Sequence, residues 1–195
     1  MELRSTSFDS YGFIPERFAN GRMAPSGETV KGENLLPQLA WEGVPEGTKT
    51  FVLCCIDDDV PTGWNDRDLS GEIPASQPRR RFVHWVQANV PADVREVAEG
   101  TGRRDVPGAA GLNDYVSGDA PEADGTGLGY DGPRPPFFDA RWHVYRWVVL
   151  ALDVELVLPA VFRLADVEAL VKGHVLGTAE VSGRYTLNPR LRPAG

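Results

Sequence analysis

The sequence is poor in cysteine: it has only two, Cys54 and Cys55, and they are adjacent. Neighbouring Cα atoms across a trans peptide lie about 3.8 Å apart, closer than an ordinary disulfide spans. The pair is therefore best interpreted as two small buried hydrophobic residues of a protein in a reducing compartment. Because the chain has neither a CxxC nor an HxxxH pattern, it lacks the usual zinc signatures, and we expect no metal and no cofactor.

Long apolar runs and an excess of positive charge are also missing. The longest uninterrupted apolar runs, such as WVVLAL at 147–152, are far shorter than the roughly 20 residues of a membrane span. The opening residues, MELRSTSFDSYGF, show no signal-peptide pattern, so we expect a cytoplasmic protein without integral membrane association. Lys and Arg number 20 against 28 Asp and Glu, a formal charge of −8 that argues against nucleic-acid binding. The only basic run, PRRR at 78–81, is of the kind that is usually a solvated loop.

The residues that are present predict a β-rich chain. Its 195 residues, 42% apolar and 25% charged, fit one globular domain spanning 1–195. Enrichment in Val, Phe, Trp and Tyr between turn residues predicts three core strands, and shorter candidates lie elsewhere. The expected core strands are 48–57, 81–90 and 142–153, and the shorter ones lie near 3–8, 38–41 and 180–187.

One stretch predicts a helix. Residues 164–177 keep apolar side chains at helical spacing, and Asp166 offers an N-cap. The strands come first and the helix late, without the alternation that builds a parallel sheet. We therefore expect a mainly β fold, an antiparallel β-sandwich with peripheral short helices and long loops.

Two long segments, 62–80 and 100–129, show no sustained apolar period. Structureless loops of this length are uncommon in compact domains, so they are either functional lids or poorly ordered additions. The first contains Trp64, Leu69 and Ile73, and apolar side chains of this size are seldom left exposed to solvent in a loop. We expect it to form a partial lid or a homodimer contact.

Two of the three histidines fall near the beginning of expected strands, where neighbouring loops could form the mouth of a pocket. Alternation along each strand turns both imidazoles toward an apolar face. The alternative is a pair of core histidines, each bonded to a backbone carbonyl. The residues that share a period-two face are Phe82, Val86, Ala88 and Val90 for His84, and Tyr145, Trp147, Val149 and Ala151 for His143.

An acidic turn and a proline-rich loop accompany the histidines. DDDVP at 57–61 closes the first core strand, and GPRPP at 132–136 makes a stiff rim ahead of the third. A carboxylate placed against two imidazoles would orient them and favour their cationic forms, which predicts an anion site. The alternatives are a solvated Asp turn and an ordinary loop.

Five ordered blocks resemble those of the phosphatidylethanolamine-binding protein family, in its bacterial Raf-kinase-inhibitor-like branch. The resemblance runs from about Phe13 to Tyr185 and implies a β-sandwich with a small preformed pocket for phosphate-like head groups. The blocks are NLLPQLAWEGVPEGTKTFVLCCIDDDVP, FVHWVQANVP, GYDGPRPP, HVYRWVVLALD and HVLGTAEVSGRY.

On the matching positions, the resemblance implies ligand-binding roles for Asp59, with the ligand-side carboxylate, and for His84, Trp85, Pro136, His143 and Tyr145. Arg134 departs from the family pattern, which usually has a small residue or cysteine there. An arginine at that point either clamps an anion bidentately or plugs the pocket by reaching Asp58 or Asp59.

These observations favour a small-anion binding protein with a regulatory role and no catalytic turnover. Anion affinity is then expected to fall as pH rises past the titrations of His84 and His143. One alternative is a hydrolase or lyase that uses Asp59, His84 and His143 as an acid–base cluster. Another is a protein-interaction module whose pocket is vestigial and filled by Arg134.

Overall fold

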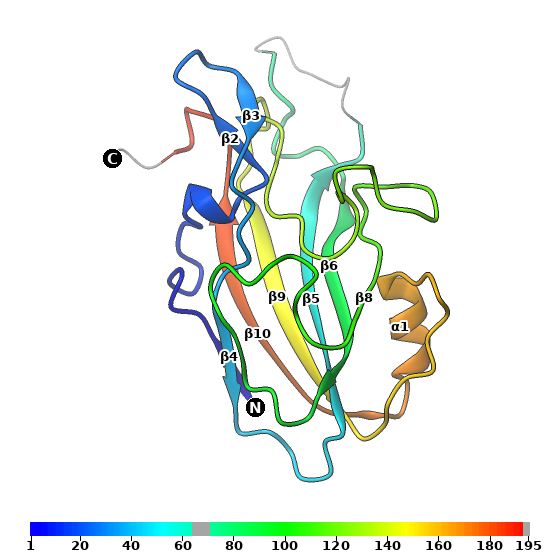
Figure 1. Ribbon diagram of the computed structural model, residues 1–195. Coiled ribbons are helices and arrows are strands. Elements are labelled where there is room, and N and C mark those ends of the chain that lie inside the picture. The colour runs from blue at the N-terminus through cyan, green and yellow to red at the C-terminus, as the bar shows by residue number, and fades with distance from the viewer. Residues whose placement is uncertain (64–70, 193–195) are drawn as a thin grey trace.

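A five-stranded antiparallel sheet, in the order β10-β9-β5-β6-β8, forms the centre of the fold (Figure 1). The computed structural model describes residues 1–63 and 71–192. Three short strands make a second sheet, in the order β1-β4-β7, and β2 and β3 form a separate hairpin. The central strands are β5 (Thr50–Pro61), β6 (Arg79–Pro91), β8 (Ala109–Ala110), β9 (His143–Leu152) and β10 (Val175–Tyr185). The other elements are β1 (Glu2–Arg4), η1 (Glu16–Phe18), β2 (Gly21–Met23), β3 (Thr29–Lys31), β4 (Leu39–Glu42), β7 (Glu96–Val97) and α1 (Leu164–Leu170).

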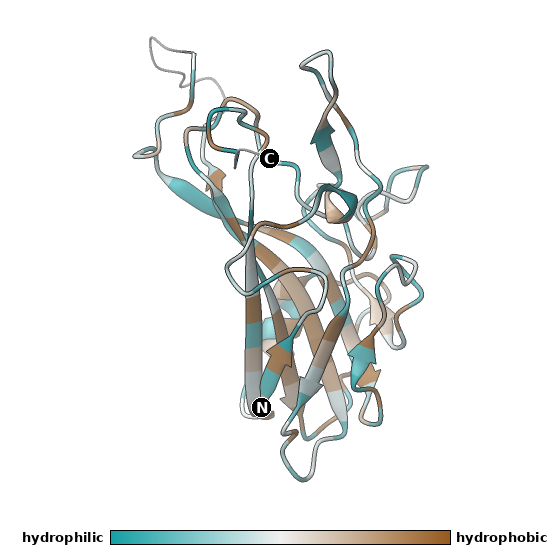
Figure 2. Cartoon of the chain, turned by 90° about the vertical axis from the view of Figure 1, so that its left-hand side faces the viewer, coloured by the Kyte–Doolittle hydropathy of each residue, from teal (hydrophilic) through white to brown (hydrophobic). Residues whose placement is uncertain are grey.

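Both faces of the central sheet are covered. Alternate residues of β5 and β9 pack toward the β1-β4-β7 sheet, and that inner cluster includes Trp147 and Phe51. The other residues of these strands pack against α1 and the chain around it, where Phe162 and Val167 are buried. Figure 2 shows the long strands mostly in the brown of apolar residues, with teal in many of the loops. The expected antiparallel β-sandwich is confirmed.

The helix is shorter than expected. α1 ends at Leu170, and Gly173 then takes a φ of 83°, a left-handed turn that glycine adopts without strain. The chain returns at once as β10, so residues 175–177 are strand rather than helix. Asp166 is not the N-cap: its carboxylate accepts the Arg163 backbone N–H at 2.8 Å from the first turn of α1. No helix in residues 1–63 and 71–192 is long and apolar enough to cross a membrane.

A β-bulge in β6 changes the direction of His84. The pairing of β6 with β5 shifts by one residue between Trp85 and Val83, so His84 has no partner of its own on β5. The expectation that Val86 and Ala88 share the face of His84 is therefore wrong, because both lie in the cluster on the α1 side. His84 is nevertheless buried, and it points inward as expected.

Segment 100–129 is anchored to the rest of the fold by Arg163, the residue just before α1. Its guanidinium donates to the backbone carbonyl groups of Asn113, Val116 and Gly118 at 2.8–2.9 Å. Three carbonyl groups in one turn are thereby fixed by a single side chain from a distant part of the chain.

We expect Arg163→Met to loosen residues 112–128 without disturbing the central sheet. Methionine keeps the apolar stem but loses all three hydrogen bonds, so the free energy of unfolding should fall by about 1–2 kcal/mol. Hydrogen exchange and urea denaturation measure the two effects, and Lys172→Met, an exposed site after α1, is the matched control. Unchanged exchange at 112–128 would show that Arg163 does not hold this segment.

Candidate functional site

A cavity of about 240 Å³ opens at the end of the central sheet where β5 ends and β6 and β9 begin, the upper end in Figure 1. Its walls come from these three strands, from segment 100–129 and from the proline-rich loop. The lining residues are Asp57, Val60, Phe82, His84, Asp114, Tyr115, Arg134, Pro135, Pro136, His143 and Tyr145.

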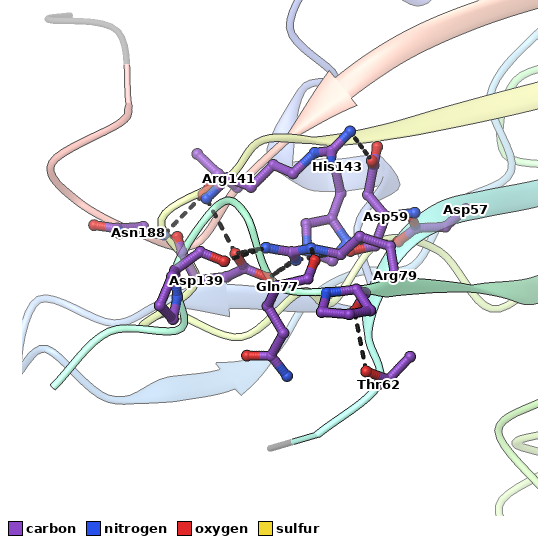
Figure 3. Close-up of polar contacts among 12 residues, drawn as sticks. Asp57, Asp59, Thr62, Gln77, Arg79, Asp139, Arg141, His143 and Asn188 are labelled. Carbon is purple, nitrogen blue, oxygen red and sulfur yellow. Dashed lines mark hydrogen bonds and ion pairs between the residues drawn. The ribbon is translucent and has the colours of Figure 1, made fainter. Parts of the chain in front are cut away.

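His143 stands between two buried carboxylates. Its Nδ1 lies 2.7 Å from Asp57 Oδ2, and its Nε2 lies 3.1 Å from Asp139 Oδ2 (Figure 3). Arg79 contacts both oxygens of Asp139, with Nη2 3.0 Å from Oδ1. These four side chains, Arg79, Asp139, His143 and Asp57, are at most 8% exposed, and we call them the buried charge row.

The two carboxylates keep His143 cationic. Burial by itself would lower the pKa of His143, but Asp57 and Asp139 outweigh it and raise the pKa to about 9. Burial would likewise raise the pKa of Asp139, yet His143 and Arg79 outweigh it and lower that pKa. Both ring N–H groups of His143 are already used, so the imidazolium has none to offer a ligand.

His84, unlike His143, is not kept cationic by its surroundings. Burial lowers its pKa, and the opposing effects of Asp57 and of the hydrogen bond to Asp131 do not compensate. The ring is therefore neutral at pH 7, and Nδ1–H donates to the Asp131 carbonyl oxygen at 2.7 Å. Its other nitrogen, Nε2, is then a hydrogen-bond acceptor on a ring that lines the cavity. The expectation that a carboxylate favours the cationic form holds for His143 and not for His84.

Two tyrosine side chains line the cavity, and their hydroxyl groups differ in how they are bonded. Tyr115 Oη donates to the Gly132 carbonyl oxygen at 3.0 Å. Tyr145 is completely buried, and its hydroxyl makes no hydrogen bond of ordinary geometry with a described residue, although it interacts with the Asp57 carboxylate. Burial and the Asp57 carboxylate raise the pKa of Tyr145 well above its usual value, so it remains a neutral donor.

Arg134 lines the cavity from an exposed position on the rim, with its aliphatic stem against Gly21. Its guanidinium makes no ion pair or hydrogen bond with any residue of 1–63 or 71–192. Asp58 pairs instead with Arg146 at 2.6 Å. The interpretation of Arg134 as a plug that reaches Asp58 or Asp59 is therefore wrong, and its charge is available to a ligand.

Two expected site residues do not line the cavity. Asp59 Oδ2 accepts the Val144 N–H at 2.9 Å and Oδ1 pairs with Arg141 at 2.8 Å, so Asp57 and not Asp59 is the carboxylate of the cavity (Figure 3). A bulge in β5 after Asp57 separates these two aspartates, which simple alternation would place on one face. Trp85 is buried in the inner core beyond the bulge of β6.

Sequence reasoning missed the polar cluster that holds His84. Asp131, whose carbonyl binds His84, is completely buried, and its carboxylate accepts from Asn113 Nδ2 at 2.8 Å and pairs with Arg103. Asn113 and Arg103 belong to segment 100–129, so that segment supports the site as well as lining it with Tyr115. The NDY sequence at 113–115 was the available signal, since Asn and Asp side chains often bond local backbone groups.

The described part of segment 62–80 supplies no residue to the cavity wall. Ile73 is buried, and its backbone pairs with Phe138 and Ala140 in the loop that carries Asp139. Trp64 and Leu69 lie outside the described residues, so the lid and homodimer interpretations stay predictions. Among residues 1–63 and 71–192, no three His, Cys, Asp or Glu side chains are grouped so as to hold a metal ion.

We expect the free energy of unfolding to fall as pH rises through the titration of His143. Its pKa is raised in the folded protein, so the stabilisation is complete below pH 6.5 and is lost as pH passes 9. The shift corresponds to a loss of about 3 kcal/mol. Urea denaturation at a series of pH values measures it, and His143→Gln should flatten the profile. Identical slopes for the two proteins would contradict the role given to His143.

Comparison with known proteins agrees with this architecture. The model of the family described as phosphatidylethanolamine-binding protein matches residues 4–186. A UPF0098 protein of Aquifex aeolicus is 34% identical over 183 residues, covering 91% of this chain and 92% of that protein. The UPF0098 protein YbhB of Escherichia coli is 38% identical over 130 residues, or 67% of each chain.

Solved structures give the same result. The crystal structure of Escherichia coli YbcL, described as a new member of the mammalian PEBP family, superposes with a TM-score of 0.69 at 26% identity, covering 95% of this chain and 97% of that one. A putative PEBP homologue from Chlamydia trachomatis, CT736, gives the same TM-score and identity, covering 94% and 95%. The chain therefore belongs to the phosphatidylethanolamine-binding protein family.

Proposed function

We propose that the cavity binds a small oxyanion that carries its own proton, such as inorganic phosphate or a phosphate monoester head group in its monoanionic form, without chemical turnover. The observation that carries the proposal is the buried hydroxyl of Tyr145, a residue of the cavity wall, which makes no hydrogen bond of ordinary geometry with any described residue. An unsatisfied buried donor costs free energy, and a ligand oxygen in the cavity would satisfy it. Arg134 supports this by placing at the rim a positive charge that makes no ion pair with residues 1–63 or 71–192.

The acceptors in the wall favour an anion with a hydroxyl group. Asp57 and the Nε2 of neutral His84 both face the cavity as acceptors, so a ligand oxygen beside either one has to donate a hydrogen. Inorganic phosphate carries such a hydrogen near neutral pH and sulfate does not, whereas a phosphate monoester, whose second pKa is about 6, carries it mainly below that pH. The same arrangement therefore supports a preference for phosphate over sulfate.

The residues of the wall also support binding without turnover. No serine, threonine or cysteine is among the described residues that line the cavity. The two cysteines are buried thiols, and burial raises the pKa of Cys54 to about 12. Asp59, a member of the expected acid–base cluster, faces Arg141 instead. Membership of a binding-protein family fits a ligand-dependent regulatory role.

Replacement of Arg134 tests the proposed function most simply. We expect Arg134→Gln to weaken phosphate binding by about fivefold, the value of a charge-assisted contact at a partly exposed site. Calorimetric titration with phosphate measures the affinity. Lys49→Gln removes the same charge at the far end of β5 and should leave binding unchanged. Stronger binding by Arg134→Gln would show that this arginine blocks the cavity.

The pH dependence of sulfate binding isolates His84, because sulfate itself does not titrate between about pH 5 and 8. His143 stays cationic over that range, so a change in affinity there belongs to His84. We expect sulfate affinity to rise at least about tenfold as pH falls below 6.5 and His84 gains its proton. His84→Gln should remove this rise, and a rise that persists in the variant would contradict the assignment.

A further inference from the structure

The buried charge row joins the cavity wall to two residues that do not line it. Asp57 and His143 are part of the cavity wall, whereas Arg79 and Asp139 lie behind them. Arg79 is the first residue of β6, and Asp139 lies in the loop before β9. Figure 3 shows these four side chains close together, with Asp139 near Asn188. The row alternates in sign: cation, anion, cation, anion.

Arg79 makes more hydrogen bonds than its ion pair with Asp139 alone would provide. Besides its two contacts with Asp139, it donates to the carbonyl oxygens of Asp59 at 2.9 Å, Pro74 at 3.0 Å and Gln77 at 3.1 Å. Together these contacts use all five N–H groups of the guanidinium. A lysine offers three donors from a single point, so it cannot reproduce this arrangement.

Asp139 is fixed from the other side as well. Its Oδ1 accepts the Arg141 backbone N–H at 3.1 Å, and its own carbonyl oxygen accepts from Asn188 Nδ2 at 2.9 Å. With Arg79 and the backbone holding it, Asp139 gives the Nε2–H of His143 one fixed acceptor. The ring can then present Nδ1–H to Asp57 in only one orientation.

We propose that Arg79 and Asp139 are positioning residues of the cavity, which act through His143 to fix the Asp57 carboxylate as an acceptor and so set the preference for phosphate over sulfate. The proposal rests on the proposed function, since it concerns which anions the same cavity accepts. Neither residue touches the ligand. Their effect passes through the ring of His143, whose two N–H groups are divided between Asp139 and Asp57.

Other charged groups around His143 do not replace this arrangement. His143 faces Asp57 from β5 and Asp139 from the preceding loop, and Tyr145 of its own strand stacks on it at 6.4 Å. From β6, His84 interacts with it and is neutral near pH 7, whereas Arg79 of the same strand contacts Asp139. Asp57 and Asp139 are therefore the two groups that orient the ring.

An effect of net charge alone and the proposed positioning effect predict different changes in anion affinity for Arg79→Gln and Asp139→Asn. If only charge mattered, Arg79→Gln would weaken the binding of every anion and Asp139→Asn would strengthen it. If the row positions Asp57, both variants free the ring of His143 and both lower the preference for phosphate. The ratio of phosphate affinity to sulfate affinity therefore separates the two explanations.

The experiment is calorimetric titration of the full chain with inorganic phosphate and with sulfate at about pH 7.5, where His84 is neutral. We expect Arg79→Gln and Asp139→Asn each to lower the phosphate-to-sulfate ratio by about fivefold, the factor that one hydrogen bond contributes. Arg79→Lys, which keeps the charge but not the five contacts, should lower it as well and replaces Arg79→Gln if that variant does not fold. Arg141→Gln removes a neighbouring positive charge outside the row and should leave the ratio unchanged.

A second measurement does not depend on ligand binding. Nitrogen-15 spectra of the wild type at the same pH should show both ring nitrogens of His143 protonated. In Asp139→Asn the ring should lose its second proton at lower pH than in the wild type. A neutral His143 ring in the wild type at this pH would overturn the proposal.

The titrations also separate failure of this proposal from failure of the proposed function. Binding of neither anion by the wild type would overturn both. A wild-type preference for phosphate that is unchanged in Arg79→Lys and Asp139→Asn, or that moves in opposite directions in Arg79→Gln and Asp139→Asn, would overturn the positioning role alone.

Discussion

The imidazolium of His143 between two buried carboxylates is the interaction on which the rest of the site depends. A buried charge without a partner of opposite sign would carry a large desolvation cost. Each charged side chain of the row is therefore stabilised by the oppositely charged side chain beside it. The arrangement joins the end of β5, the beginning of β6 and the loop before β9 (Figure 3). It also determines the chemistry of the cavity, because it occupies His143 fully and leaves Asp57, Tyr145, His84 and Arg134 to meet a ligand.

Irregularities in the sheet are what make this site possible. A regular β6 would alternate without interruption, and the bulge instead turns His84 and Trp85 to one face, where one lines the cavity and the other packs in the core. The bulge in β5 separates Asp57 from Asp59 in the same way. The two bulges near the cavity end of β5 and β6 therefore support both packing and binding.

Much of the fold follows from local patterns in the sequence. Alternation in β9 correctly placed His143 and Tyr145 on the inner face, and the proline-rich loop correctly indicated a rim with Arg134. Alternation could not reveal the bulges, because a bulge leaves no gap in the pattern of residue types. It places Asp57 and Asp59 on one face and could not choose between them, and Asp59 and Trp85 were expected in the site from the family resemblance.

The supporting polar residues were harder to predict for a different reason. Arg79 belongs to a basic run that resembles a solvated loop, yet its side chain is only 8% exposed. Asp131 and Asp139 lie in irregular segments, where aspartate is usually exposed. Burial of such groups depends on partners far away in the chain, such as Arg103 and Arg79, and only the folded structure brings those partners together.

The central claim is that the cavity holds a proton-bearing oxyanion through Tyr145 and Arg134. A crystal structure grown in the presence of phosphate near neutral pH tests it most directly. We expect one phosphate in the cavity, with an oxygen within hydrogen-bond distance of Tyr145 Oη and the guanidinium of Arg134 turned toward it. An empty cavity, or a phosphate bound only elsewhere on the surface, would contradict the claim.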